Sequence, residues 1–231
     1  YFSEKLKLFN LNKDNGSSVV MIDDEYGKRI AELNSNVKCI SLKNEDADYF
    51  CTSYSINSFG LAGTLAWDSE TLDFESKLIG SFNLENLTLA ASIAIELNIS
   101  AQSIAKGIEN CTNIDGRLHL VENQKNQMIF LDYAHSPDAY FRTLKALEEN
   151  FSRPLKVLFG AGGGRDKSKR PKMAEVVEKY SIECYLAPDN PRFEDIELIN
   201  NDVIKGFSNE SHHIFNDRKE ALIFALTNLK S

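Results

Sequence analysis

Apolar positions in the first half of the chain predict five short strands. Two apolar runs are typical of strands buried on both faces; they cover residues 18–24 and 37–42. Three later segments alternate apolar and polar residues and are separated by turn residues; they cover residues 49–56, 61–67 and 72–78. Alternation of this kind predicts antiparallel strands with one face on the core.

Helical spacing of apolar residues predicts three helices in the same half. The first lies at the start of the chain, in YFSEKLKLFN, and the others cover residues 82–98 and about 101–111. Ser81 and Ser100 precede the last two helices. Both are suitable N-cap residues, because a serine hydroxyl accepts a hydrogen bond from an unpaired helical N–H group.

The second half has a different rhythm, in which each predicted strand precedes a helix. The predicted strands cover residues 128–132, 155–159 and 182–187, and the segment HHIF. The predicted helices cover residues 137–149, 171–180, 191–207 and 217–230. This alternation predicts a parallel, doubly wound sheet, so the fold class is α/β. Residues 112–119 break the pattern between the two halves and are a candidate hinge.

Composition narrows the classes of protein to which the chain can belong. Its 231 residues, 42% of them hydrophobic, are enough for one large domain or two small ones. A net charge of −8 and a pI near 5.1 argue against a general nucleic-acid binder. The chain has no run of ~18 apolar residues and does not open on a signal peptide, so we expect a cytoplasmic protein that does not span a membrane.

The cysteines and histidines show no metal-binding or disulfide pattern. Cys39, Cys51, Cys111 and Cys184 are scattered without C-x-x-C spacing, which predicts buried free thiols. The four histidines form neither H-E-x-x-H nor a zinc-finger pattern.

Three polar loops follow predicted strands, where a parallel sheet places its ligands. They are DYAHSPDA (132–139), GAGGGRDKSKRP (160–171) and PDNPR (188–192). Each has a proline where a helix is predicted to begin, a position at which proline costs no hydrogen bond; these are Pro137, Pro171 and Pro191. Ser136 and Asn190 are placed as N-caps, so the loops lie beside helix N-termini that favour anions.

The glycine-rich loop matches neither common phosphate-binding motif. Arg165 stands where both G-x-x-x-x-G-K-[ST] and G-x-G-x-x-G require a glycine. A strand enters the loop and a helix leaves it, which argues against a linker. The loop is therefore expected to be a tight turn that presents cations to a carboxylate or phosphate, together with Arg192 from the next loop. Those cations are Arg165, Lys167, Lys169 and Arg170. A solvated basic loop is the alternative.

These segments resemble the Mur ligases of peptidoglycan synthesis. The resemblance rests on LDYAHSPDA, FGAGGGRDKSKRP and DNPR, with GSFNLENLTLAAS and DGRLHLVE upstream. It runs over nearly the whole chain in the same order, and the three loop motifs are specific only together. It implies a central mixed-sheet ATPase domain, present in part at residues 1–115, and a Rossmann-like amino-acid-binding domain at residues 116–231.

The resemblance also implies an activity and its partners. ATP would phosphorylate the terminal carboxylate of UDP-N-acetylmuramoyl-L-alanyl-D-glutamate, and the amine of meso-diaminopimelate would attack the acyl phosphate. Transfer of this kind depends mainly on positioning and on charge neutralisation by Mg²⁺ and cations. The expected protein is a monomeric ligase with ATP and Mg²⁺ as cofactors.

Site residues for ATP and Mg²⁺ follow from the same resemblance. Lys5 matches a carbamylated lysine, whose oxygens suit Mg²⁺, and its position beside an apolar stripe predicts partial burial. Asn83 and Asn86 match the adenine segment, although helix capping is an alternative for both. Arg117 matches a hinge arginine that reaches the ATP phosphates, with an ordinary linker charge as its alternative.

Asp132 matches the acid that binds the ATP ribose, and its carboxylate can accept two hydroxyl hydrogen bonds. His135, in the same turn, is assigned with Lys5 and Arg117 to the catalytic group, with stabilisation of the turn an equal alternative.

Four residues match the pocket for the incoming amino acid: Arg165, Asp189, Asn190 and Arg192. Diaminopimelate differs from lysine by a second carboxylate, and Arg192 supplies its charge partner. An unpaired buried carboxylate is costly, so one arginine discriminates strongly.

The sequence also departs from the family. It has no G-T-N-G-K-T segment, no G-K-G-H-E segment and no UDP-binding domain, so we expect a piece that is inactive alone. A lysine-adding ligase, a folylpolyglutamate synthetase and a noncatalytic binder of nucleotide or small acid remain alternatives.

Overall fold

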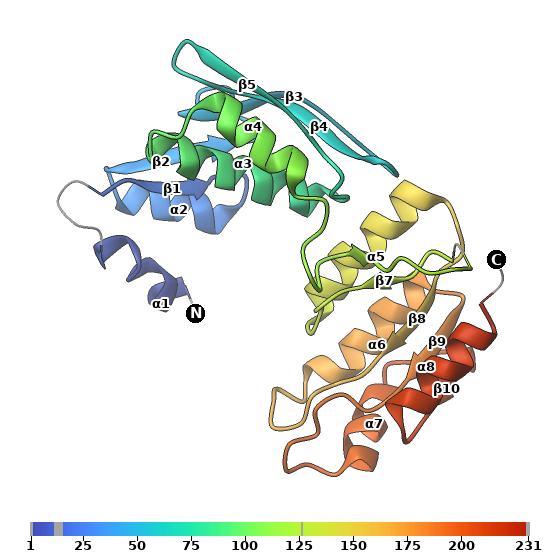
Figure 1. Ribbon diagram of the computed structural model, residues 1–231. Coiled ribbons are helices and arrows are strands. Elements are labelled where there is room, and N and C mark those ends of the chain that lie inside the picture. The colour runs from blue at the N-terminus through green and yellow to red at the C-terminus, as the bar shows by residue number, and fades with distance from the viewer. Residues whose placement is uncertain (1, 12–15, 126, 230–231) are drawn as a thin grey trace. The chain divides into compact units, whose positions relative to one another are not determined.

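The chain folds as two compact units, Tyr1–Asn113 and Ile114–Ser231, in the computed structural model (Figure 1). The structure describes residues 2–11, 16–125 and 127–229. No helix among these residues is long and apolar enough to cross a bilayer. Cys51 and Cys184 are buried free thiols as predicted, whereas the free thiols Cys39 and Cys111 are only half-buried.

The first unit contains a five-stranded mixed sheet in the order β1-β2-β3-β4-β5. The strands are β1 Ser18–Met21, β2 Val37–Ser41, β3 Tyr49–Asn57, β4 Gly60–Trp67 and β5 Glu70–Ser76. β1, β2 and β3 run parallel, and β3, β4 and β5 are antiparallel. All five predicted strands are confirmed, including the antiparallel pairing of the last three.

The helices of the first unit differ from the prediction in three places. They are α1 Phe2–Leu6, α2 Glu25–Leu33, α3 Ser81–Glu96 and α4 Ala101–Asn110, with a 3-10 turn at Phe9–Leu11. The predicted first helix is therefore much shorter than expected. α2 was not predicted, because Gly27 is its one buried residue and its surface is largely charged. Gly80, not Ser81, is the N-cap of α3, whereas Ser100 caps α4 as predicted, accepting a hydrogen bond from the Ser103 N–H.

Helices α3 and α4 pack on this sheet and close its core. α3 packs on β1, β2 and β3, and α4 packs on β5. The core contains Ile40 and Leu65, which have no exposed surface, together with Leu84 of α3 and Ile104 and Ile108 of α4. Strand pleating and helix spacing thus turn the predicted apolar positions to one shared interior.

The second unit contains a three-stranded parallel sheet in the order β10-β9-β8. The strands are β8 Lys156–Phe159, β9 Glu183–Leu186 and β10 His212–Ile214, and the helices are α5 Pro137–Phe151, α6 Lys169–Tyr180, α7 Ile196–Ile204 and α8 Arg218–Thr227. Cys184 and Leu186 pack with α5, α6 and α7, whereas Tyr185 contacts Phe224 of α8. Because strand residues alternate between faces, α8 covers the face opposite α5–α7, and the predicted doubly wound sheet is confirmed.

Four predicted boundaries in this unit are wrong. The strand predicted at 128–132 forms β7 Phe130–Leu131, which pairs antiparallel with β6 His119–Leu120 in a separate two-stranded sheet. α7 begins at Ile196 with Asp195 as its N-cap. The predictions that a helix begins at Pro191 and that Asn190 caps it are therefore wrong. Pro171 is the third residue of α6, which follows Ser168. The predicted last helix ends at Thr227, and its residue 230 lies outside the described residues.

Two helical glycines are expected to respond oppositely to substitution. A Cβ at Gly27 would lie 1.8 Å from the Met21 carbonyl oxygen, so Gly27→Ala forces the backbone apart and should cost about 1–3 kcal/mol. A Cβ at Gly107 meets nothing within 4 Å, so Gly107→Ala should stabilise α4 by roughly 0.5–1 kcal/mol. Urea unfolding followed by fluorescence of Trp67, the one tryptophan in the sequence, reports on this unit. Equal shifts of the urea midpoint in the two variants would contradict the surroundings described for Gly27 and Gly107.

Candidate functional site

The loops after β8 and β9 lie against each other and form the centre of the site. The Gly163 N–H donates to the Asn190 carbonyl oxygen at 2.8 Å. A Cβ at Gly160 would lie 2.1 Å from the Ala187 carbonyl oxygen, and one at Gly163 would lie 1.9 Å from that of Pro191. Glycine is required at both positions because the two backbones approach too closely for any side chain. The glycine-rich segment is therefore a packed turn, as predicted, and not a linker.

The side chains of Arg165 and Arg192 approach the same glycine. A Cβ built at Gly162 would lie 3.4 Å from Arg192 Nη1 and 3.9 Å from Arg165 Cγ. Both arginines are exposed. The Arg192 Nη1 donates to the Gly163 carbonyl oxygen, and its backbone adopts a left-handed φ of 53°. The Arg192 guanidinium and the aliphatic stem of Arg165 therefore lie beside one glycine at the carboxyl ends of β8 and β9, where a parallel sheet places its ligands.

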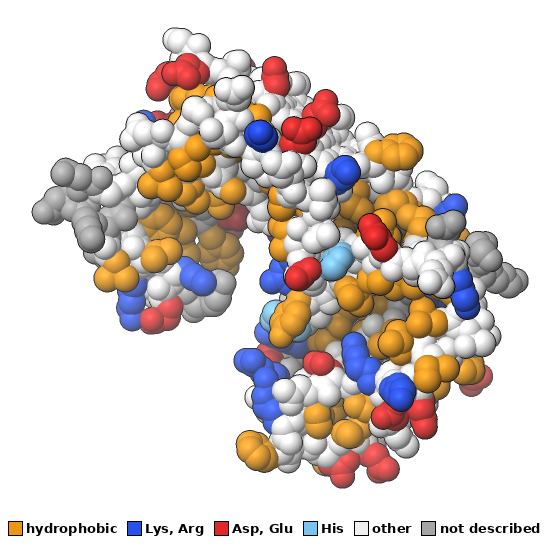
Figure 2. All heavy atoms as spheres, viewed as in Figure 1, with side chains coloured by type: hydrophobic (Ala, Val, Ile, Leu, Met, Phe, Trp, Pro, Cys, Tyr) orange, Lys and Arg blue, Asp and Glu red, His pale blue; other side chains and the backbone are white. Residues whose placement is uncertain are grey.

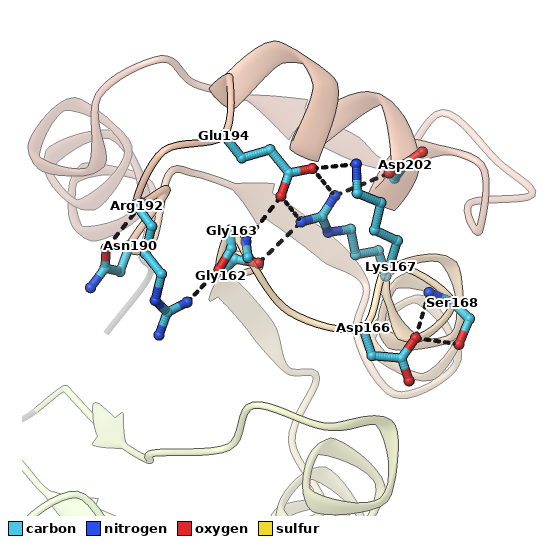
Figure 3. A network of polar contacts seen from close by, with 11 residues as sticks. Gly162, Gly163, Asp166, Lys167, Ser168, Asn190, Arg192, Glu194 and Asp202 are labelled. Carbon is cyan, nitrogen blue, oxygen red and sulfur yellow. Dashed lines mark hydrogen bonds and ion pairs between the residues drawn. The ribbon is translucent and has the colours of Figure 1, made fainter.

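The DNPR segment is shaped by its own side chains. The Asn190 Oδ1 accepts the Arg192 N–H at 3.2 Å, which closes a local turn around Pro191. Figure 3 shows Asn190 and Arg192 on one side of the glycine pair, with Glu194, Lys167 and Asp202 on the other. Asp189 is exposed beside them. Figure 2 shows basic side chains gathered on this unit.

Arg170 does not belong to the predicted cationic pocket, because its side chain is buried. The residue is 1% exposed, and both terminal nitrogens of its side chain bind carboxylates. Nη1 donates to Glu194 Oε1 at 2.9 Å and to Asp202 Oδ2 at 3.1 Å. Nη2 donates to Glu194 Oε2 at 2.7 Å and to the Gly162 carbonyl oxygen at 3.2 Å. The Arg170–Glu194 contact is thus a bidentate ion pair, which removes this cation from any ligand.

Glu194 was missed by the sequence analysis, yet it joins the two loops. Its Oε2 also accepts the Gly164 N–H at 3.0 Å, and its Oε1 pairs with Lys167 Nζ at 2.8 Å. Hydrogen bonds from Arg170, then from Lys167 and Gly164, hold the pKa of Glu194 far below its ordinary 4.5. In the sequence Glu194 is one acidic residue among many, and nothing local marks its partners.

Asp132 is committed largely to the protein itself. Its Oδ2 accepts the Leu118 N–H at 2.9 Å, and its Oδ1 accepts the Ala134 N–H at 2.8 Å and the Thr143 hydroxyl at 3.3 Å. A carboxylate offers about four acceptor positions. Three are therefore occupied, which leaves capacity for one hydroxyl hydrogen bond where the sequence predicted two.

Arg117 and His135 both contact Tyr133. The Arg117 guanidinium lies 5.8 Å from the centre of the Tyr133 ring, and the Gly116 carbonyl oxygen accepts the Tyr133 N–H at 2.8 Å. The His135 Nδ1 lies 3.0 Å from the Tyr133 carbonyl oxygen, and the two rings meet edge to face. Both side chains are exposed, so the local turn positions them without burying them.

The predicted site residues of the first unit lie in two different environments. Asn83 is 1% exposed, and its amide donates to the Ile79 carbonyl oxygen at 2.8 Å. This bond ties the first turn of α3 to the residues before it. Asn86 is exposed on the same helix. Lys5 is exposed on α1, so the predicted partial burial is wrong. The structure thus keeps Asn86 and Lys5 accessible and turns Asn83 into the core.

Other features of the described residues do not add to this set. A groove of about 880 Å³ lies between β3–β5 and α4, and its lining includes none of the predicted site residues. Among residues 2–11, 16–125 and 127–229, no three Asp, Glu, His or Cys side chains gather as a metal site. An exposed lysine is reachable for carbamylation, and Mg²⁺ needs only one or two carboxylate-like ligands when phosphates and waters complete its shell.

Comparisons with known proteins follow the same two units. Residues 1–94 match the Mur ligase middle domain, and residues 116–231 match the Mur ligase glutamate ligase domain. The chain is 36% identical over 231 residues to UDP-N-acetylmuramoyl-L-alanyl-D-glutamate--2,6-diaminopimelate ligase of Fusobacterium nucleatum, covering 98% of this chain and 47% of that protein. It is 33% identical to the protein of the same name from a Nostoc species, covering 89% and 42%. The chain therefore spans about half the length of these curated relatives.

Solved structures show the same fold. A structure of UDP-N-acetylmuramoyl-L-alanyl-D-glutamate--2,6-diaminopimelate ligase is 30% identical with a TM-score of 0.60, covering 100% of this chain and 48% of that one. Mycobacterium tuberculosis folylpolyglutamate synthase complexed with ADP has a TM-score of 0.80 at 15% identity, covering 98% and 51%. The second likeness carries the fold alone, because its identity is low.

The Arg170 network is expected to make stability depend on pH in acid. The folded-state pKa of Glu194 lies below the ordinary value, so its contribution is fully present above pH 4.5 and is lost as pH falls further. Glu194→Gln should therefore lower the urea midpoint at about pH 7 and reduce its dependence on pH between about pH 4.5 and 3. Circular dichroism measures both.

Glu197→Gln is the matched control, because it removes an exposed carboxylate from the first turn of α7. It should leave the acid dependence of the wild type intact. An equal acid dependence in Glu194→Gln and wild type would contradict the assignment.

Proposed function

Since this chain belongs to the Mur ligase family, we propose that it is part of an ATP-dependent ligase that adds meso-diaminopimelate to UDP-N-acetylmuramoyl-L-alanyl-D-glutamate. ATP would transfer its γ-phosphate to the terminal carboxylate of the dipeptide. The diaminopimelate amine would then displace phosphate from the acyl phosphate and form the amide. Relatives that are 33% and 36% identical to this chain carry the name of that ligase, which supports the proposal.

The two halves are assigned different tasks in this proposal. Residues 1–115 form the C-terminal part of the central ATP-binding domain, and residues 116–231 form the amino-acid-binding domain. Because the curated relatives are about twice as long, the reaction as a whole belongs to the complete protein that contains this chain.

The observation that carries the proposal is the meeting of Arg165 and Arg192 beside Gly162. Diaminopimelate brings two carboxylates, and the guanidinium groups of Arg165 and Arg192 would supply two planar, bidentate partners for them. We call the edge at Gly162 that carries these two side chains the rim. Arg192 donates meanwhile to a backbone carbonyl, so its guanidinium is already directed toward this rim. Asp189 and Asn190 border the same rim and offer acceptors for an ammonium group.

ATP contacts are assigned separately to each unit, to residues near the start of the second unit and to α3 of the first. Asp132 retains one acceptor position for a ribose hydroxyl. Arg117 is exposed on a turn tied to Tyr133 and supplies a cation for phosphate, while His135, which contacts the same tyrosine, adds an imidazole ring. Asn86 is the accessible member of the predicted adenine pair, and Asn83 supports the helix start from the core.

We assign Mg²⁺ binding to Lys5 in its carbamylated form. The carbamate is an anionic oxygen donor, which is the ligand chemistry that Mg²⁺ prefers. Bound Mg²⁺ would neutralise phosphate charge during transfer. Nucleic acid and membrane lipid have no place in this proposal, and a monomer remains the expected state.

Arg192→Ala in the complete protein should lower kcat/KM for diaminopimelate by roughly 30-fold or more, because a carboxylate left without its charge partner costs about 2 kcal/mol or more. The KM for ATP should stay unchanged, since Arg192 faces the amino acid. Steady-state assays of phosphate release measure both.

Arg153→Ala is the control, because Arg153 is another exposed arginine of the same unit outside the two loops. An unchanged kcat/KM in Arg192→Ala would refute the assignment. A wild type that prefers lysine to diaminopimelate would favour the lysine-adding alternative.

A further inference from the structure

We propose that Arg170 and Glu194 are positioning residues that set the places of Arg165 and Arg192 and thereby the specificity for a doubly acidic amino acid. The specificity rests on the proposed function, whereas the positioning stands on the contacts alone. Neither side chain reaches the rim itself. Their ion pair instead determines how the two loops that carry the rim arginines meet.

Contacts of this pair join four segments of the second unit. Arg170, in the first turn of α6, binds Glu194 of the loop after β9 with two parallel hydrogen bonds of 2.9 and 2.7 Å. Its Nη2 also holds the Gly162 carbonyl oxygen in the loop after β8, and its Nη1 reaches Asp202 of α7. One guanidinium therefore fixes both loops to the helices behind them (Figure 3).

Short stretches of backbone connect this pair to the rim arginines. Glu194 is two residues from Arg192, and its Oε2 accepts the N–H of Gly164, the residue before Arg165. The Glu194 N–H in turn donates to the Pro191 carbonyl oxygen at 3.0 Å. Loss of the carboxylate would therefore release the backbone beside both arginines at once.

Electrostatics give a reason for a carboxylate at this place. The two loops bring several cations together, and like charges in proximity repel. Glu194 pairs with Arg170 and Lys167, so it offsets part of this repulsion while no acidic ligand is bound. Its position between the loops keeps Arg165 and Arg192 beside Gly162 before a dicarboxylate arrives. Such preorganisation favours binding, because less order is lost to the ligand.

Burial explains why this pair is rigid. The Arg170 side chain is 2% exposed and that of Glu194 is 14% exposed, so water competes weakly for either group. Removal of one partner leaves a buried charge unpaired, which makes the contact costly to break. The other arginines and lysines of the two loops are exposed and free of this constraint.

The test uses Glu194→Gln in the complete protein, a substitution that keeps the shape and removes the charge. We expect the KM for diaminopimelate to rise by about tenfold or more, the scale of a lost hydrogen bond to a charged group. The KM for ATP should change by less than about twofold. Hydrogen exchange of the segment 160–168, followed by mass spectrometry, should become faster, because glutamine has one acceptor oxygen for the Arg170, Lys167 and Gly164 donors that the two carboxylate oxygens bind.

Asp202→Asn is the matched control. It also removes a carboxylate from Arg170, but Asp202 lies on α7 and binds Arg170 of α6 and Lys205 at the end of α7, neither of which belongs to the two loops. It should leave the exchange of 160–168 and the KM for diaminopimelate near the wild-type values. Arg170→Lys is a second test, which applies if Glu194→Gln folds poorly. It keeps the buried charge without the bidentate contact, so it should also speed the exchange of 160–168 and raise the KM for diaminopimelate.

The outcomes separate the two proposals. Faster exchange and a raised KM in Glu194→Gln, with neither in Asp202→Asn, support positioning. Unchanged exchange in Glu194→Gln and Arg170→Lys overturns it, as does an equal effect of Asp202→Asn. A wild type that ligates no diaminopimelate overturns the proposed function alone, because the exchange measurement still decides whether the ion pair orders the loops.

Discussion

A buried guanidinium between two loops is the constraint on which the second unit depends. Arg170 is 1% exposed and gains its stabilisation only from Glu194, Asp202 and the Gly162 carbonyl oxygen. Burying a cation is costly unless charge and hydrogen bonds compensate. The loops after β8 and β9 therefore have to meet where those acceptors converge, and the exposed cations of the loops take their places from that meeting.

The glycines and the ion pair act together on one geometry. Gly160 and Gly163 allow backbones to touch at distances that any side chain would prevent. The Arg170–Glu194 pair holds the backbones there, and Gly164 supplies the N–H that completes the carboxylate's shell. A glycine-rich segment that resembles a phosphate-binding loop by composition is thus a packed turn whose function is to carry side chains. The same physics, close approach at the end of a parallel strand, serves both kinds of loop.

Some residues of the proposed site also stabilise the fold. Asp132 holds the turn before α5 through the N–H groups of Leu118 and Ala134 and the Thr143 hydroxyl. Asn83 likewise completes the start of α3 from inside the core. For such residues the loss of a ligand contact and the loss of a structural hydrogen bond coincide. Arg165 and Arg192 are different, because both are exposed and most of their bonding capacity is available to a ligand.

Local patterns along the chain predicted the class of fold, nearly all strands and the loops in which the candidate site lies. Periodicity and turn residues are local signals, and they sufficed for β1–β5, for β8–β10 and for most helices. The sequence did not predict α2, which is largely polar. It also placed β7 in the parallel sheet instead of in a separate pair with β6, and it treated Arg170 as one more surface cation. Only the tertiary structure decided which cation is buried, because the partners of Arg170 lie 24 and 32 residues away along the chain. Charge pairing over such separations leaves no periodic trace, so it becomes visible only when the loops meet.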